Sequence, residues 1–188
     1  MSKNVIIADA DYIDNVAFDL TVNFERMIGR PIPKADMARW VDCVALDGGI
    51  RHGENDTLVV LIHDKQTSGL KYFTPGTFLT ELNGQAFNDD LGEFTFEAYP
   101  VEEMTTKTDF LLDVVQTMCQ QQEVTHLMIV AADTIYNNVR ATLQHVDDNQ
   151  KRITVFTMQP LPGGNFRQEI LGYSLMAALG IRAEEIGT

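Results

Sequence analysis

The sequence predicts an α/β fold in three layers, with a mostly parallel five-stranded sheet between helices on both faces. Two kinds of segment carry this prediction. Apolar runs such as "VIIA" (5–8) and "HLMIVAA" (126–132) are nearly continuous, which is typical of strands buried on both faces. Between such runs, apolar residues recur at three- and four-residue spacing, as they do in amphipathic helices. This alternation of strand and helix is the order found in parallel sheets.

The first third of the chain contains two predicted strands and two predicted helices. A buried strand over residues 4–8 leads into an amphipathic helix that ends near Gly29. After a break at two prolines, a second helix stops at the pair Gly48-Gly49, because glycine is common just past a helix end. The run "DTLVVLIHD" (56–64) then supplies the second strong strand.

The middle of the chain, from about residue 65 to 103, is expected to be an irregular insert because glycine and proline punctuate it. Alternation in "LKYF" (70–73) and "EFTFEAY" (93–99) predicts further strands. A short helix around residues 78–82 is expected between them.

The last third returns to regular alternation. A helix with Phe110, Leu111, Val114 and Val115 on one face precedes the strand at 126–132. Another helix and the strand "RITVFTM" (152–158) follow, and the segment "NFRQEILGYSLMAALGI" (165–181) predicts a final helix that packs on the sheet.

The composition is that of a globular protein and narrows the classes of function. Hydrophobic residues make up 45% of the 188 residues and charged residues 22%, so one domain over residues 1–188 is expected. The formal charge of −13 repels phosphate backbones, which disfavours nucleic acid as a partner. The sequence shows neither a run of about 20 apolar residues nor a secretory signal, so no membrane contact and a cytoplasmic location are expected.

Four aspartates follow predicted strands. They are Asp9 and Asp11 after the first strand, Asp64 after the second, and Asp133 after the strand that begins at His126. The carboxyl ends of parallel strands meet at one edge of a sheet, so these carboxylates are candidate ligands of a hard divalent cation, Mg²⁺ or Mn²⁺. The default alternative is that Asp11 and Asp133 only favour the first turns of the helices that they open.

A second candidate site lies before the final predicted helix. Gly163 and Gly164 precede that helix and Arg167 falls in its first turn, an order that suits an anion-binding helix start. The alternative is a plain turn.

The strand ending in Asp9, the long helix behind it and the later segment "MIVAADTIYNNV" (128–139) resemble the PIN-like and NYN group of metal-dependent ribonucleases. The resemblance implies a PIN-like or Rossmann-like outline and maps that group's two catalytic strand-end aspartates onto Asp9 and Asp133. The group's later motif has a Gly-Asp-x-Asp pattern, whereas Asp133 is the single acid here, which suggests a non-catalytic relative. Asp9 and Asp11 also match the Asp-x-Asp of haloacid dehalogenase-type phosphatases, but a helix is predicted where those enzymes have a flap.

A second resemblance spans the chain. It is carried by the segments "NFERMIGR" (23–30), "ALDGGIRHGEN" (45–55), "LGEFTFEAYP" (91–100) and "LGYSLMAALGI" (171–181). These segments resemble an uncharacterised domain-of-unknown-function family from Bacteroides-like bacteria, which implies no particular activity.

Two classes of function therefore stay open. The sequence favours a non-catalytic binding or assembly module. The alternative is a divalent-metal-dependent phosphodiester or phosphate hydrolase that uses Asp9, Asp11 and Asp133, with Asp64 as a further ligand. The apolar tail "SLMAALGI" (174–181) would cover the chain's own core or a second subunit, so a homodimer is one candidate assembly.

Overall fold

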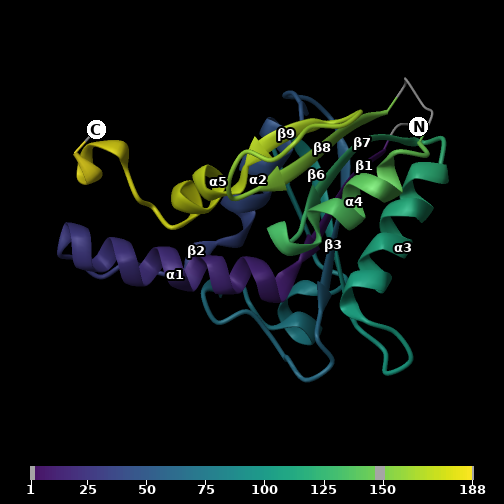
Figure 1. Ribbon diagram of the computed structural model, residues 1–188. Helices are drawn as coiled ribbons and strands as arrows, with labels where there is room; N and C mark the ends of the chain where they lie inside the picture. The colour runs from purple at the N-terminus through teal and green to yellow at the C-terminus, as the bar shows by residue number, and fades with distance from the viewer. Residues whose placement is uncertain (1–2, 147–150, 188) are drawn as a thin grey trace.

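The computed structural model describes residues 3–146 and 151–187, which adopt the expected α/β class (Figure 1). The main sheet of these residues has the strands β1 (Lys3–Asp9), β3 (Asp56–His63), β5 (Ala86–Asp89), β6 (Gly92–Pro100), β7 (Val124–Val130), β8 (Arg152–Thr157) and β9 (Arg167–Ile170). The helices are α1 (Ala10–Ile28), α2 (Met37–Asp47), α3 (Lys107–Gln120), α4 (Tyr136–Leu143) and α5 (Leu171–Ala178). Two short strands, β2 (Ala35–Asp36) and β4 (Phe73–Thr74), pair separately.

The strand order places the first strand in the middle of the sheet. From edge to edge the order is β5-β6-β3-β1-β7-β8-β9, and β5 runs antiparallel to β6. β1 pairs in parallel with β3 on one side and with β7 on the other. The parallel strands thus follow the doubly wound order 3-2-1-4-5-6, in which ligands bind where the strand order reverses. Here that point lies between β1 and β7.

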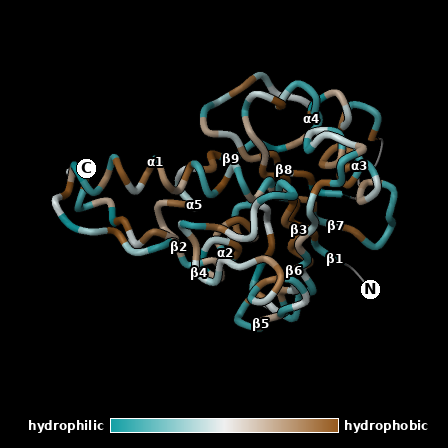
Figure 2. Tube along the Cα trace, turned by 90° about the horizontal axis from the view of Figure 1, so that it is seen from below, coloured by the Kyte–Doolittle hydropathy of each residue, from teal (hydrophilic) through white to brown (hydrophobic). Residues whose placement is uncertain are grey.

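Two hydrophobic cores cover the two faces of the sheet. Side chains alternate between the faces of a strand, so Ile6 of β1 joins the core with α1, α2 and α5, whereas Ile7 joins the core with α3 and α4. Figure 2 shows α3 and α4 together on one side of the strands and α2 and α5 on the other. This arrangement confirms the predicted three layers.

Helix α1 begins and ends where the sequence signals indicate. The side chain of Asp9 accepts a hydrogen bond of 3.1 Å from the amide of Tyr12, which caps the first turn. At the other end Gly29 has a φ of 72°, and its amide donates to the carbonyl of Glu25. Glycine adopts this left-handed conformation without strain. The predicted helix end near Gly29 is confirmed.

The prediction of five strands is wrong, because the sheet of the described residues has seven. The strands β5 (AFND) and β9 (RQEI) at the two edges are four residues long and are exposed or half-buried. Edge strands pair on one side only and carry charges that hinder edge-to-edge association. Such strands lack the continuous apolar run that marks the central ones.

The prediction of one helix over residues 165–181 is also wrong. Its first part is β9, which pairs in parallel with β8, and α5 begins only at Leu171. Within α5, Leu171, Leu175 and Ala178 are buried in the chain's own core. The apolar tail therefore covers its own core, and this removes the tail as an argument for a second subunit.

The middle of the chain is more than the irregular insert that the sequence predicts, because it supplies a strand in the interior of the main sheet. β6 pairs in parallel with β3 from Glu93 to Pro100, so this predicted strand belongs to the main sheet. The predicted short helix is present as one π-helical turn, Phe78–Leu82. The predicted strand at 70–73 is wrong in extent, because only Phe73–Thr74 pairs, and its partner is β2.

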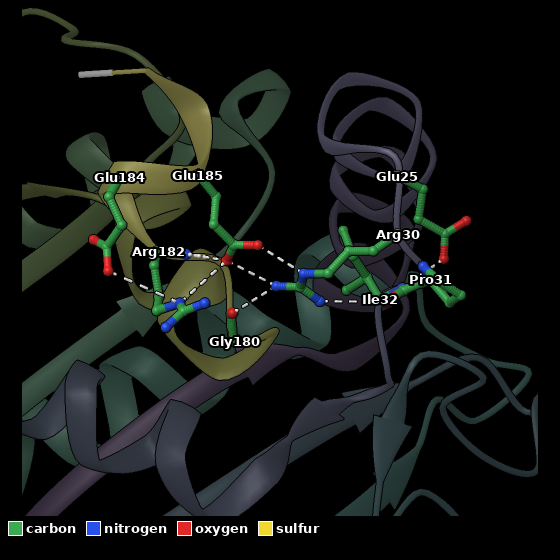
Figure 3. Close-up of polar contacts among 8 residues, drawn as sticks. All are labelled: Glu25, Arg30, Pro31, Ile32, Gly180, Arg182, Glu184 and Glu185. Atoms are coloured by element: carbon green, nitrogen blue, oxygen red, sulfur yellow. Dashed lines mark hydrogen bonds and ion pairs between the residues drawn. The ribbon is translucent and has the colours of Figure 1, made fainter.

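The end of the chain is attached to the far end of α1, which projects from the body of the domain (Figures 1 and 2). The guanidinium of Arg30 donates to both carboxylate oxygens of Glu185, at 2.7 and 2.8 Å, and to the carbonyl of Gly180 at 3.1 Å (Figure 3). Glu185 also accepts from the amide of Arg182. The hydrogen bonds from Arg30 and then from Arg182 lower the pKa of Glu185 to about 2.

Among the described helices, none combines the length and the apolarity that crossing a lipid bilayer requires.

We expect Glu185→Gln to loosen the C-terminal segment without unfolding the domain. The variant loses the charged pair with Arg30, so amide hydrogen exchange over residues 181–187 should accelerate roughly tenfold while the sheet is unchanged. The control is Glu184→Gln, because Glu184 is exposed and lies 4.0 Å from Arg182. Equal exchange in the two variants would contradict the attachment through Arg30.

Asp42 of α2 makes the stability of the domain depend on pH. Burial, followed by a hydrogen bond and like charge from Asp89 of β5, raises its pKa to about 7, and Asp36 and Asp90 add to the repulsion. A carboxyl group whose pKa is raised in the folded state stabilises the protein below the unfolded value of 3.8, and this stabilisation is lost as the pH rises through about 7.

We expect Asp42→Asn to flatten this dependence. Asparagine keeps the shape of the protonated carboxyl group and cannot ionise, so the variant should gain stability over the wild type at pH 8 and differ little at pH 4. Urea unfolding at the two pH values measures the difference. The same substitution at exposed Asp113 controls for a change in net charge. A difference in stability between the wild type and Asp42→Asn that is the same at the two pH values would refute the mechanism.

Candidate functional site

The candidate site lies at the carboxyl edge of the sheet, where β1, β3 and β7 end. β1 and β7 are neighbours in parallel register, with Ala8 opposite Val130. Asp9 at the end of β1 and Asp133 just after β7 therefore lie at the same edge, as the sequence predicts. Asp64 follows β3 on the other side of β1.

Asp9 is 7% exposed and has two partners. It caps α1 through the amide of Tyr12, and its Oδ1 lies 3.4 Å from the ammonium of Lys107. Burial raises the pKa of Asp9, although the positive charge of Lys107 opposes that shift.

Asp11 and Asp14 hold the loop after β3 against α1. Asp11 accepts a hydrogen bond of 2.7 Å from the amide of Asp64, and Asp14 accepts from the amides of Lys71 and Tyr72 at 3.0 and 2.8 Å. Burial alone would raise the pKa of Asp11, but the Asp64 amide and the Lys107 ammonium together lower it. The carboxylates of Asp11 and Asp14 near the start of α1 thus position the loop after β3.

Lys107, the first residue of α3, joins three of the carboxylates. Its Nζ lies 3.1 Å from Asp11 Oδ2 and 3.4 Å from both Asp9 Oδ1 and Asp64 Oδ2. A cation at this end of a helix opposes the helix dipole, so the carboxylates account for its position. Burial would lower the pKa of Lys107, but the three carboxylates raise it, so the ammonium stays charged at neutral pH. We refer to Asp9, Asp11, Asp64 and Lys107 as the Lys107 cluster.

Asp133 lies outside the Lys107 cluster. Its Oδ1 accepts a hydrogen bond of 3.0 Å from the amide of Met158, which joins the end of β7 to the end of β8. The phenol of Tyr12 accepts from the Asp133 amide. Burial raises the pKa of Tyr12 to about 12, and the charges of Asp133 and Asp9 contribute. Tyr12 thus stands between the two strand ends.

The structure brings together three of the four predicted metal ligands. Asp9, Asp11 and Asp64 converge on one point, and Lys107 occupies that point. No group of three or more His, Cys, Asp or Glu residues suited to hold a metal ion is found within residues 3–146 and 151–187. Metal binding by these aspartates stays a prediction.

Sequence reasoning missed Lys107 and Tyr12. A signal for Lys107 was present, because Thr106 caps α3 through the amide of Asp109 and so marks Lys107 as the first helical residue, where a basic side chain is out of place. Tyr12 had no such signal, because an aromatic residue in a first turn is more often part of a core.

The Lys107 cluster opens on a hollow of about 390 Å³ that Asp11, Asp64, Phe18, Tyr72 and other residues line. The rings of Phe18 and Tyr72 lie 5.1 Å apart. The hollow therefore has an acidic end and an aromatic end.

The predicted anion site at Gly163, Gly164 and Arg167 assumed that a helix begins at Arg167, and this assumption is wrong. Arg167 begins an edge strand instead of a helix, so Gly163 and Gly164 do not precede a helix as predicted. A Cβ atom on Gly164 would lie 2.5 Å from the ring of Phe166, which explains the glycine by packing. Anion binding at these residues stays a prediction.

Replacement of Lys107 by methionine should destabilise the domain, because three carboxylates would lose their shared cation. We expect a loss of about 2–3 kcal/mol in the free energy of unfolding at pH 7, measured by urea titration. The control, Lys65→Met, removes an exposed pair with Glu103 and should cost less than about 1 kcal/mol.

The effect of Lys107→Met on the free energy of unfolding should depend on pH. Because the pKa of Asp11 is lowered in the folded state, its contribution is present above the unperturbed value of 3.8 and is lost as the pH falls below it. The difference between wild type and Lys107→Met should therefore narrow at low pH. A difference that is small at pH 7 would show that the cluster contributes little.

Comparison with known proteins places the chain in a family. The model of the family of unknown function DUF6621 matches residues 1–186, so the chain belongs to that family. No curated protein and no solved structure matches it. Membership agrees with the resemblance to a family without an assigned activity, and the PIN-like resemblance stays a prediction.

Proposed function

We propose that this protein is a non-catalytic binding module whose acidic strand ends are closed by an internal ion-pair network. The observation that carries the proposal is the position of the Lys107 ammonium, within 3.4 Å of Asp9, Asp11 and Asp64. The carboxylates that would recruit a cation already share one. Their other contacts hold backbone in place, which is a structural role.

The charge of Lys107 opposes a divalent ion at the same point. Two unit charges 4 Å apart interact by about 4 kcal/mol at the effective dielectric constant of a protein surface, so Lys107 would subtract about 8 kcal/mol from the attraction between the three carboxylates and a divalent ion. Binding would require Lys107 to swing out and give up three partners.

The shape of this edge supports a binding role. The hollow beside the Lys107 cluster lies outside the carboxyl ends of parallel strands, where open α/β sheets bind ligands, and its volume of about 390 Å³ suits a small molecule. Its walls are fixed, because Asp11 and Asp14 bind the backbone of the loop that forms one side.

The second candidate function is a metal-dependent phosphodiester or phosphate hydrolase, and one observation favours it. Three carboxylates from the ends of two adjacent strands approach a single point, as the oxygen ligands of Mg²⁺ or Mn²⁺ do. If Lys107 left, Asp9, Asp11 and Asp64 would hold the ion, which would polarise a phosphoryl oxygen. Asp133, which accepts from the Met158 amide, stays outside this set of ligands.

Nucleic acid stays disfavoured as a partner because of the formal charge of −13. A homodimer stays a prediction. The apolar side chains that bear on it are those exposed on α1, Phe18, Val22 and Met27, of which Met27 is 65% exposed.

Calorimetric titration with Mn²⁺ separates the two functions. We expect no binding to the wild type and new binding to Lys107→Met, because that variant keeps the three carboxylates and removes their competitor. Lys65→Met is the control for the loss of a lysine elsewhere and should behave as the wild type. Stoichiometric Mn²⁺ binding to the wild type, abolished by Asp9→Asn, would overturn the proposal in favour of the hydrolase.

A further inference from the structure

A second hollow of about 500 Å³ opens beside the Lys107 cluster. His63 at the end of β3, Phe78 and Leu79 of the π-helical turn, and Ala98 of β6 contribute to its walls. Thr67 lines both this hollow and the acidic one, so the two are adjacent. Its volume lies within the range of small-molecule sites. We refer to it as the His63 hollow.

His63 offers a hydrogen-bond acceptor to this hollow. The side chain is 6% exposed, and its Nδ1 lies 2.8 Å from the backbone oxygen of Asp64. A carbonyl oxygen can only accept, so Nδ1 of the neutral ring carries the proton and Nε2 carries the lone pair. Within the part of the chain that the structure describes, Nε2 has no hydrogen-bond partner. The buried polar atoms that lack a partner in the described residues do not include Nε2, so this nitrogen is open to solvent, where a donor from a ligand can reach it.

Asn83 offers the complementary donor. Its Oδ1 accepts a hydrogen bond of 2.9 Å from the amide of Ala98, which assigns the amide orientation and leaves the NH₂ group for another partner. Asn83 also lines the hollow. One acceptor and one donor therefore serve the same cavity.

The apolar walls are suited to a flat ligand. The rings of His63 and Phe78 are stacked, with centroids 3.9 Å apart and planes 8° apart. Leu79 on the same turn is 79% exposed, an unusual position for a large apolar side chain that lines a cavity. The stack with Phe78, which is 3% exposed, holds the His63 ring in place, and the exposed side chain of Leu79 supplies the apolar surface that can cover a planar ring.

The charges around the hollow favour an uncharged ligand over a phosphorylated one. The ammonium of Lys65, which lines the hollow, lies 3.2 Å from Glu103 and is therefore paired. The neighbouring Lys107 is shared by three carboxylates. The carboxylates of Glu103 and of the Lys107 cluster therefore place negative charge beside both cations, and this charge repels a phosphate group.

We propose that the His63 hollow binds a planar, uncharged nitrogen heterocycle of nucleoside size. An N–H group of the ligand donates to His63 Nε2, and a ring nitrogen or carbonyl of the ligand accepts from the Asn83 amide. The proposal rests on the proposed function, because it names the ligand class of the binding module.

The test is calorimetric titration with adenosine, guanosine, cytidine and uridine, followed by titration with the 5′-monophosphate of each nucleoside that binds. At least one nucleoside should bind with a Kd below about 1 mM, and its own monophosphate should bind at least tenfold more weakly. In ¹⁵N-labelled protein, the nucleoside that binds should shift the Nε2 resonance of His63. Absence of binding by all four nucleosides overturns the proposal, as does a monophosphate that binds as well as its nucleoside.

Asn83→Asp is the decisive variant, because aspartate keeps the acceptor for the Ala98 amide and loses the donor. We expect roughly tenfold weaker nucleoside binding. Asn137→Asp, at an exposed position of α4, adds the same charge elsewhere and should leave binding unchanged. If Asn83→Asp fails to fold, Leu79→Ser serves instead, with Met104→Ser as its exposed control. Unchanged affinity in the folded variant places the nucleoside elsewhere and overturns the assignment.

The Mn²⁺ titration and the nucleoside titration test different sites, so one can give a negative result without the other. Mn²⁺ binding reports on the Lys107 cluster, whereas nucleoside binding and the His63 resonance report on the His63 hollow. A protein that binds neither ion nor nucleoside keeps its closed ion-pair network and loses only the ligand assigned to the hollow.

Discussion

The carboxylates at the carboxyl edge of the sheet need hydrogen-bond donors or a countercharge, and the contacts that supply them hold the surrounding elements in place. A partly buried carboxylate without partners would cost several kcal/mol. Here Asp9 accepts from the Tyr12 amide, Asp11 from the Asp64 amide, and Asp14 from the amides of the loop that ends at Tyr72. Lys107 supplies the remaining countercharge. The same contacts tie α1, the loop after β3 and the start of α3 together.

The Lys107 cluster also affects the His63 hollow, because Asp11 of the cluster and the ring of His63 both contact the backbone of Asp64. The Asp64 amide is held by Asp11, and the Asp64 carbonyl accepts from His63 Nδ1 and from the hydroxyl of Thr67. The carboxylate of Asp11 thereby helps to orient the His63 ring, and the ring orientation determines which nitrogen faces the His63 hollow. A ligand in the His63 hollow would thus depend on Asp11 through the backbone of Asp64, without touching it.

The far end of α1 is held in place by different interactions from those that hold the central strands. The central strands are buried on both faces and are held by packing, whereas the far end of α1 is held by the charged contacts of Arg30 with Glu185 and with the carbonyl of Gly180. Packing of apolar surface is short-ranged and continuous through the two cores. The projecting helix end has fewer buried side chains, since the fully buried residues of α1 stop at Ala17, so directional ion pairs matter more there.

The sequence by itself determined the elements that depend on local pattern. Continuous apolar runs identified β1, β3, β7 and β8, and the three- and four-residue spacing ending at Gly29 identified α1. The edge strands β5 and β9 were missed, because a four-residue strand paired on one side needs no apolar pattern.

Only the tertiary structure decided what the strand-end aspartates do. Three aspartates at predicted strand ends are compatible with either a metal site or a set of caps. The choice depends on Lys107, which lies 96 residues after Asp11 in the chain and reaches it through the return of the chain from β6 to β7. Likewise, the free nitrogen of His63 follows from a contact of its other ring nitrogen with a backbone oxygen. Hydrogen bonds and ion pairs are made between atoms in space, so a pattern along the chain can locate the candidate groups but cannot say which of them are already paired.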